Sequence, residues 1–359
     1  MSVPDRWNPS TWGKPGKVVF CTRSGGSIDP TTLNALKAGG LENPIITSLR
    51  GTDGKVPDEV ADADMIVLQG PGGNGDAFEA MRRVRFVFRP YVGYDDIDVD
   101  AANEYGMLVA NVPDTFVIEV ADHAMALILG VIRRTRQMDL LVRSGGWARG
   151  AQARRLAHPM RRLSTMTLGL LGFGTIARMV AERAKPFGFT IIAHDPFIPA
   201  EVAENMGVKL VSIEELFQQS DVVSVHTFLN KDTRGLVSAR LLGMMKPDAY
   251  IVNTARGPLV DEAALIKVLQ QGKIAGAGLD VMEVEPLPAD SPLNSLENVI
   301  LAPHLASFSD EGVHLHQLRV AKIILDVYHG KMPERKIVIN KGLYDELAAQ
   351  PELAGVEKA

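Results

Sequence analysis

Short apolar runs alternate with helical patterns through the first third of the chain. Five runs have the length and composition of strands, and a helical pattern such as Thr31–Leu41 lies between some of them. The runs are Lys17–Thr22, Pro44–Thr47, Met65–Leu68, Val84–Phe88 and Met107–Ala110. Strands that alternate with helices are typical of a parallel sheet. This part of the sequence therefore predicts a first α/β domain.

A strongly apolar helix is predicted next, over Val117–Arg134. Apolar residues recur along it at helical spacing, and basic residues close it, where they suit the helix dipole. Because it is apolar on nearly all sides, we expect it to be deeply buried. The Arg-rich segment Ser144–Met166 shows no clear period, which is typical of a solvated surface. The alternative is a basic arm that contacts an anionic substrate or a partner subunit.

A second series of strands begins at Thr167–Phe197, which predicts a strand, a glycine turn, a helix and another strand. Helices separate the strand-like runs that follow, and Val260–Gly272, with Asp261 as N-cap, is the clearest of them. The later runs are Val222–His226, Tyr250–Asn253, Ala275–Val281 and Val299–Ala302. An amphipathic helix over Val313–Tyr328, a strand-like Lys336–Asn340 and a polar tail complete the chain.

Composition restricts the class of protein. A length of 359 residues suits two domains, and 46% hydrophobic with 6% aromatic residues is typical of a soluble α/β protein. The net charge of −5 provides no basic excess for nucleic acid. The single cysteine, Cys21, excludes an internal disulfide and favours a reducing compartment. Since no signal peptide or membrane-spanning run is apparent, we expect a cytoplasmic protein without a membrane partner.

The glycine turn Gly172–Ala177 matches the pattern G-x-G-x-x-G/A. Gly172 permits the tight turn, Gly174 lets backbone approach a pyrophosphate, and Ala177 allows close helix–strand packing. Asp195 ends the next strand, where a carboxylate can bind the ribose hydroxyls and repel a 2′-phosphate. A turn that serves packing alone would not explain Asp195, so the pattern predicts NAD rather than NADP.

Three further residues follow predicted strands of the same sheet: Arg256, Glu285 and His304. In an open parallel sheet, ligands bind outside the carboxyl ends of the strands. Arg256 can bind a carboxylate or carbonyl oxygen. His304 can donate a proton to the carbonyl oxygen during reduction or accept one during oxidation, and Glu285 can orient His304. Singly, each residue has an ordinary structural interpretation. Together they favour hydride transfer to or from a 2-oxo or 2-hydroxy acid.

These motifs resemble the D-isomer-specific 2-hydroxyacid dehydrogenase family, in the branch of phosphoglycerate dehydrogenase-like enzymes and C-terminal-binding-protein corepressors. The matching stretches are GLLGFGTIA at Gly169–Ala177, NTARGPLVDE at Asn253–Glu262, LDVMEVEPLP at Leu279–Pro288, APH at Ala302–His304, VGYDDID at Val92–Asp98 and NVPDTFVIEVADH at Asn111–His123. The resemblance implies an α/β fold with two doubly wound parallel-sheet domains, in which a Rossmann NAD-binding domain is inserted into a flavodoxin-like substrate domain.

The domain boundaries that follow from the resemblance are 1–115 and 306–340 for the substrate domain, 116–305 for the NAD-binding domain, and 341–359 for the tail. The family also implies a homodimer built around Val117–Met166. Catalysis is assigned to Arg256, Glu285 and His304, and the backbone of Val92 and Gly93 to the substrate carboxylate. NAD would contact Gly172, Phe173, Gly174, Thr175, Ile176, Asp195, Thr227, Thr254, Ala255 and Asp280. For Asp280, a buried acid satisfied by backbone is an equal alternative. No metal is implied.

Some positions depart from the family pattern. Tyr91 replaces a glycine of the carboxylate loop, Met282 replaces a phenylalanine, and Phe228 replaces a proline. Ala306 and Ser307 follow His304 where glycines are common. These changes reshape a pocket without removing a catalytic group, so the particular 2-hydroxy acid stays open.

Two other functions are considered. An NAD(H)-sensing regulatory protein, as in the corepressor branch, would keep the same triad, but the chain has no long motif-bearing tail after Asn340. Formate oxidation is disfavoured, because the family member that oxidises formate carries glutamine at the position of Glu285. His123 is interpreted as a packing or hydrogen-bonding residue. His314 and His316 do not share a helix face and make a poor metal pair.

Overall fold

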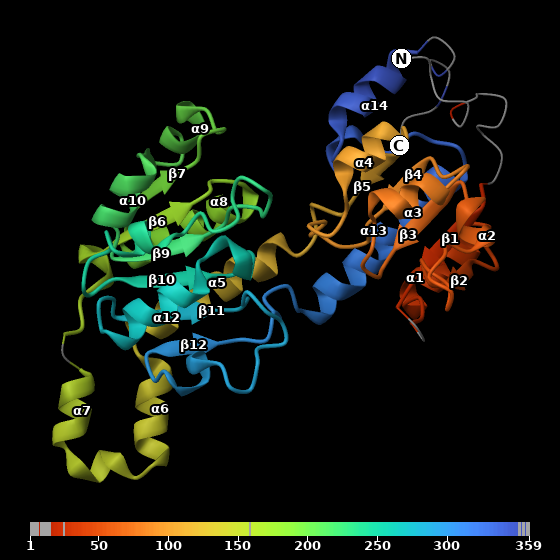
Figure 1. The fold of residues 1–359 in the computed structure, drawn as a ribbon. Helices are drawn as coiled ribbons and strands as arrows, with labels where there is room; N and C mark the ends of the chain where they lie inside the picture. The colour runs from red at the N-terminus through yellow and green to blue at the C-terminus, as the bar shows by residue number, and fades with distance from the viewer. Residues whose placement is uncertain are drawn as a thin grey trace. The chain divides into compact units, whose positions relative to one another are not determined.

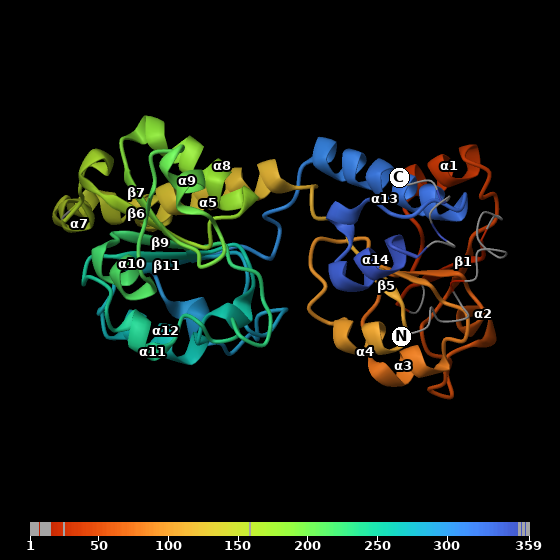
Figure 2. The ribbon, with the colours of Figure 1, turned by 90° about the horizontal axis from the view of Figure 1, so that it is seen from above.

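The computed structural model describes Trp7 and residues 16–23, 26–157, 159–350, 353 and 356. It divides into two compact units, which we call unit 1 (Met1–Thr115 and Asp310–Ala359) and unit 2 (Phe116–Ser309). Each contains one parallel sheet with helices on both faces (Figures 1 and 2). None of the helices in the described part of the chain combines the length and apolarity needed to cross a membrane.

Unit 1 has a five-stranded sheet in the order β2-β1-β3-β4-β5, the flavodoxin-like order. Its strands are β1 (Val18–Cys21), β2 (Ile45–Thr47), β3 (Met65–Leu68), β4 (Phe86–Phe88) and β5 (Leu108–Ala110). Its helices are α1 (Pro30–Ala38), α2 (Asp58–Ala61), α3 (Gly75–Ala80), α4 (Val99–Glu104), α13 (Asp310–Tyr328) and α14 (Lys341–Ala348), with the 3-10 turn η8 (Arg335–Ile337).

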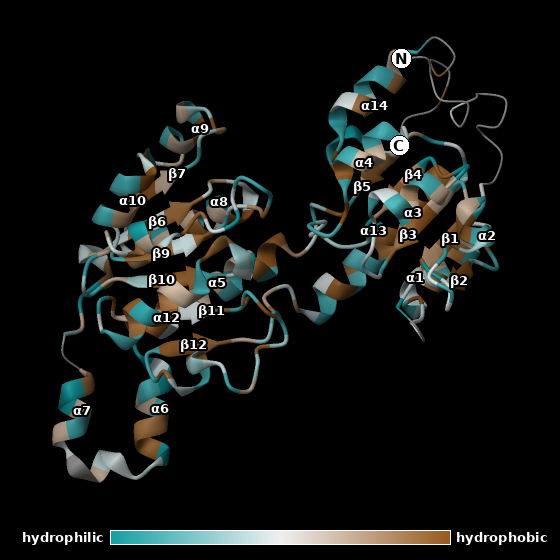
Figure 3. Cartoon of the chain, viewed as in Figure 1, coloured by the Kyte–Doolittle hydropathy of each residue, from teal (hydrophilic) through white to brown (hydrophobic). Residues whose placement is uncertain are grey.

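Alternate residues along the strands of unit 1 enter two separate cores. Phe20 and Val67 pack with α13 and α14, whereas Val19 and Ile66 pack with α2, α3 and α4. This alternation follows from the two-residue period of a strand, and it makes every strand residue apolar when both faces are covered. Figure 3 shows the resulting apolar sheet. The short continuous runs of β1, β3, β4 and β5 thus reflect burial on both faces, whereas the edge strand β2 is largely exposed.

Two predictions for the end of the chain are wrong. Lys336–Asn340 is not a strand: it begins within η8 and makes a single isolated bridge, Ala110 with Val338. The ladder stops because the Asn340 side chain, rather than backbone, accepts the hydrogen bond from Val109 N at 2.9 Å. The segment after it is also no simple tail, since α14 buries Tyr344 and Leu347 in the core of unit 1.

Unit 2 has a seven-stranded parallel sheet in the order β12-β11-β10-β9-β6-β7-β8. The strand order reverses between β6 and β9, as in a Rossmann fold. Its strands are β6 (Thr167–Leu171), β7 (Thr190–His194), β8 (Lys209–Leu210), β9 (Val222–Val225), β10 (Tyr250–Asn253), β11 (Gly276–Leu279) and β12 (Val299–Leu301).

Helices cover both faces of this sheet. One face packs against α5 and α8, and the other against α10, α11 and α12. The helices of unit 2 are α5 (Val117–Ile132), α6 (Thr135–Arg143), α7 (Ala151–Leu156), α8 (Thr175–Ala184), α9 (Ala200–Glu204), α10 (Ile213–Gln219), α11 (Ala239–Leu242) and α12 (Glu262–Gln270). The 3-10 turns are η3 (Gly146–Arg149), η4 (Leu163–Thr165), η5 (Lys185–Phe187), η6 (Gly257–Leu259) and η7 (Pro292–Ser295). Asp261 caps α12 as expected, accepting from Ala264 N.

The expectation of deep burial holds for one side of α5, where Ala124 and Ile128 are fully buried, but not for Ile118 near its start. The Arg-rich segment is more ordered than its sequence suggested, because it contains α7. Figure 1 shows α6 and α7 extending away from the sheet of unit 2, and neither helix has a buried residue. Arg161 instead pairs with the buried Asp221 at 2.6 Å.

Candidate active site

The glycine turn joins β6 to α8 at the carboxyl edge of the sheet. Gly172 has φ +88°, and a Cβ there would lie 2.9 Å from Thr227 N, so both backbone and space require glycine. A Cβ on Gly174 would meet nothing within 4 Å, which leaves open space above the start of α8. Gly174 is the N-cap residue of α8, and no side chain accepts a hydrogen bond from the first amides of this helix. These amides therefore stay available to an anion. The turn thus fits a dinucleotide pyrophosphate.

Asp195 follows β7 and is held by this turn. Its Oδ2 accepts from Phe173 N at 2.8 Å and its Oδ1 from Phe197 N at 2.9 Å. A carboxylate has about four lone-pair positions, so both oxygens can still accept hydrogen bonds from ribose hydroxyls. The two backbone bonds fix the direction of the carboxylate before any nucleotide binds.

Thr254 follows β10 and carries a buried hydroxyl. Its Oγ1 has no hydrogen-bond partner within the described residues. A buried orphan hydroxyl is costly unless a ligand satisfies it, which fits the predicted cofactor contact. Two further predicted contacts, Thr227 and Ala255, are already bonded: the Thr227 hydroxyl donates to Leu171 O, and Ala255 N donates to Asn253 Oδ1.

Arg256 lies in a turn that Asn253 organises. The buried Asn253 side chain accepts from Ala255 N at 3.0 Å and donates to Arg256 O at 2.8 Å. Sequence reasoning missed this role, although an asparagine at a strand end is a recognisable signal for such a turn. Arg256 Nη1 donates to Ala255 O at 2.7 Å. A Cβ on Gly257 would lie 1.8 Å from Met282 O, so this turn touches the segment that leads to Glu285.

Glu285 and His304 form the direct pair that the sequence predicts. His304 Nδ1 lies 2.6 Å from Glu285 Oε2, and Glu285 Oε1 accepts from Met282 N at 3.0 Å. The carboxylate is an acceptor, which assigns a proton to Nδ1 and leaves Nε2 for another partner. The His304 side chain is 44% exposed, so a substrate can reach it.

Asp280 is fully buried after β11 and binds backbone. Its two carboxylate oxygens accept from Leu305 N and Ala306 N, each at 3.0 Å. The geometry therefore agrees with the alternative interpretation of a strand-end acid that backbone amides satisfy, and it places this acid directly beneath the loop that begins at His304.

His226 is another histidine at this edge of the sheet. Its Nε2 lies 2.9 Å from Ser224 Oγ, and burial lowers the pKa of its imidazole to about 4. It is therefore neutral near pH 7 and cannot replace His304 as a proton donor there.

The predicted carboxylate loop lies in unit 1. The carbonyl oxygens of Pro90, Tyr91, Val92 and Gly93 all accept hydrogen bonds from within that unit. The donors, in the same order, are His316 Nε2, Val112 N, Asn111 Nδ2 and Arg89 Nε, at 3.0, 3.3, 2.6 and 3.4 Å. The amides of Val92 and Gly93 have no acceptor in the described part of the chain. Successive free amides of this kind suit a carboxylate.

Arg89 stiffens the carboxylate loop. Its guanidinium forms a bidentate pair with Asp96, at 2.7 and 2.8 Å, and donates to the carbonyls of Leu68 and Gly70. The ring of Tyr91, the residue that replaces a glycine, lies 5.5 Å from Arg89 Cζ and is half-exposed. The substituted side chain is thus accommodated by stacking on Arg89.

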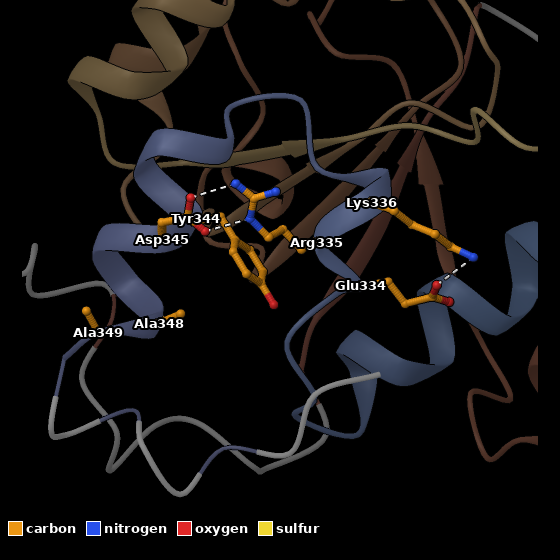
Figure 4. A pocket seen from close by; sticks show the side chains of 7 residues that line it. All are labelled: Glu334, Arg335, Lys336, Tyr344, Asp345, Ala348 and Ala349. Atoms are coloured by element: carbon orange, nitrogen blue, oxygen red, sulfur yellow. Dashed lines mark hydrogen bonds and ion pairs between the residues drawn. The ribbon is translucent and has the colours of Figure 1, made fainter. Parts of the chain in front are cut away.

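A separate cavity of about 630 Å³ lies in unit 1 between η8 and α14 (Figure 4). It contains none of the predicted site residues. Its cations are paired with neighbours, Arg335 with Asp345 at 2.7 Å and Lys336 with Glu334 at 2.9 Å, as the dashed lines show. The arrangement offers no free charge to a ligand.

Residues 125–306 match the family model described as D-isomer specific 2-hydroxyacid dehydrogenase, NAD binding domain. The chain is 41% identical over 265 residues to a glyoxylate reductase from Korarchaeum cryptofilum, covering 72% of this chain and 78% of that protein. The chain belongs to the D-isomer specific 2-hydroxyacid dehydrogenase family. It contains the family's NAD-binding domain and has the family's two-domain α/β fold.

Two more relatives differ in name and length. A D-3-phosphoglycerate dehydrogenase from Methanocaldococcus jannaschii is 39% identical over 286 residues, which cover 78% of this chain but only 52% of that protein. The chain thus spans about half the length of that relative. A D-lactate dehydrogenase from Aquifex aeolicus, complexed with NAD and lactic acid, has a TM-score of 0.72 at 28% identity and covers 87% of this chain and 96% of that one.

Proposed function

We propose that the protein transfers a hydride between NAD(H) and C2 of a small 2-hydroxy or 2-oxo acid. The observation that carries the proposal is the Glu285–His304 hydrogen bond in the same unit as the glycine turn. NAD(H), when bound, supplies or accepts the hydride. The residues Gly172, Phe173, Gly174, Thr175, Ile176, Asp195, Thr227, Thr254 and Ala255 are proposed to form its site. Asp280, whose carboxylate accepts from Leu305 N and Ala306 N, is proposed to support this site from the adjoining His304 loop.

The protein's own groups bind the substrate and transfer the proton. During reduction, His304 Nε2 donates a proton to the carbonyl oxygen, and it accepts one during oxidation. Glu285 accepts a hydrogen bond from His304 Nδ1 and thereby orients the ring. Arg256 binds the substrate through its planar guanidinium, and the amides of Val92 and Gly93 bind the carboxylate. The named relatives support small substrates of the glyoxylate and lactate type.

A spectrophotometric screen tests the proposal. NADH oxidation is followed at fixed protein concentration with glyoxylate, hydroxypyruvate, pyruvate and phenylpyruvate. We expect turnover with at least one of these 2-oxo acids. Turnover with none of them, together with intact NADH binding, would favour the NAD(H)-sensing regulatory function instead.

Cofactor selectivity depends on Asp195 in this proposal. Asp195→Ala is expected to lower the preference for NADH over NADPH by about tenfold or more, because the carboxylate that accepts from ribose and repels a 2′-phosphate is lost. The ratio of kcat/KM for the two cofactors measures the effect. Asp232→Ala, at an exposed position beyond β9, is the matched control. An unchanged ratio would remove Asp195 from the ribose site.

We also propose a homodimer. Four apolar side chains on α6 and η3, namely Met138, Leu140, Val142 and Trp147, are between 36% and 68% exposed. Burial between two copies would remove this apolar surface from water. Light scattering should give twice the 38.9 kDa chain mass, and a Leu140→Asp, Trp147→Asp double variant should approach the single mass. Leu315→Asp, exposed in unit 1, is the control. A monomeric wild type would refute the dimer.

A further inference from the structure

His123 has an unusual environment on α5. Its Nε2 is buried without a hydrogen-bond partner in the described residues, and it lies 3.5 Å from Asp280 Oδ1. Asp280 is fully buried. A buried carboxylate needs compensation from hydrogen bonds or from an opposite charge. Among the described residues, His123 is the one basic side chain that pairs with Asp280.

Asp280 holds three consecutive amides at the start of the His304 loop. His304 N donates to Asp280 O at 2.8 Å, and Leu305 N and Ala306 N donate to its two carboxylate oxygens. His304 itself has φ +57°, a left-handed conformation that costs free energy for a residue with a side chain. The conformation of the loop at His304 therefore depends on the Asp280 carboxylate staying directed at the two amides that follow His304.

The same face of α5 also holds the other end of this loop. Glu119 lies four residues before His123, and its Oε1 accepts from Ser309 Oγ at 2.7 Å. Residues four apart share a helix face. The start of α5 thus contacts the loop twice: directly at Ser309, and through Asp280 at residues 304–306. A packing role alone would not explain why His123 Nε2 faces the Asp280 carboxylate.

We propose that His123 is a positioning residue for the His304 loop. Its Nε2–H faces the Asp280 carboxylate, keeps it directed at the amides of Leu305 and Ala306, and thereby maintains the geometry in which His304 meets Glu285. The effect on turnover rests on the proposed function of His304, whereas the effect on the loop does not.

The variants His123→Gln and His123→Met test this role. The two side chains are similar in size and shape, but only glutamine can donate a hydrogen bond to Asp280. His123→Ala removes the donor without adding bulk, and it replaces His123→Met if that variant does not fold. His314→Met, at an exposed position of α13, is the matched control.

Hydrogen–deuterium exchange of the peptide that spans residues 302–309 is the first measurement, on the full chain without ligand. We expect exchange about tenfold faster in His123→Met than in the wild type, since the hydrogen bonds from the loop amides to Asp280 open more often. His123→Gln and His314→Met should exchange like the wild type. Equal exchange in His123→Met and His123→Gln would overturn the proposal, whether or not any substrate is turned over.

Kinetics and NADH binding are the second measurement. A small displacement of His304 is expected to lower kcat by about 10- to 100-fold in His123→Met, with rescue to within about threefold in His123→Gln. The Kd for NADH, from fluorescence titration, should change less than about twofold in both. A loss of kcat that glutamine does not rescue, or a matching loss of NADH affinity, would contradict a role through the His304 loop. If the wild type turns over no substrate, the hydrogen–deuterium exchange experiment still tests whether His123 positions the His304 loop.

Discussion

Replacement of His304 by alanine is expected to lower kcat by about 10²- to 10⁴-fold, the usual contribution of a positioned general acid or base. The Kd for NADH should stay close to the wild-type value, because the glycine turn and Asp195 are built from other segments of unit 2. The loss should appear in kcat, since His304 assists the carbonyl oxygen mainly as its charge changes. Steady-state kinetics and fluorescence titration of NADH measure the two quantities.

The control for this prediction is His314→Ala, which removes an exposed imidazole outside the proposed site. It should leave both kcat and the Kd for NADH unchanged. His304→Ala with turnover near the wild-type level would refute the proton-transfer role. His304→Ala with weak NADH binding would show that the residue acts on the cofactor site, so the two failures are distinguishable.

The sequence identified the candidate site because topology alone determines where strands end. Once β9 to β12 are predicted as parallel neighbours, the residues after them lie at one edge, and these include Arg256 and His304. Tyr250–Asn253 and Met65–Leu68 were predicted with the boundaries that the structure has. Buried parallel strands are short and apolar throughout, so their limits are clear in sequence. The predicted Glu285–His304 hydrogen bond is present because the two residues follow the neighbouring strands β11 and β12.

Sequence reasoning failed where segments far apart in the chain determine the outcome. Lys336–Asn340 has the apolar composition of a strand, but Asn340 turns the chain toward α14 through contacts with Met107 and Val109. The amides that bind Asp280 come from residues 305 and 306, which no local pattern could pair with it. The general interpretation of His123 as a packing or hydrogen-bonding residue stands, but the sequence could not name Asp280 as its neighbour, because the two are more than 150 residues apart.

Gly257→Ala is expected to destabilise unit 2 and to impair the site together. The new Cβ would lie 1.8 Å from Met282 O and 2.5 Å from Glu283 N. Both are backbone atoms, so the clash cannot be relieved by a side-chain rotation, and one of the two segments must move. We expect a loss of about 3 kcal/mol or more in the free energy of unfolding, as for other severe core clashes.

The same displacement should affect catalysis, because one segment carries Arg256 and the other carries the Met282 amide that anchors Glu285. We expect kcat/KM to fall by about 100-fold in the fraction of Gly257→Ala that folds, since a shift near 1 Å has this effect on positioned groups. Denaturant unfolding and kinetics measure both losses. Gly342→Ala is the control, since a Cβ there meets nothing within 4 Å and alanine favours the helix α14. If Gly257→Ala matched Gly342→Ala in stability and in kcat/KM, the close approach of the Arg256 and Glu285 segments would not be required for the site.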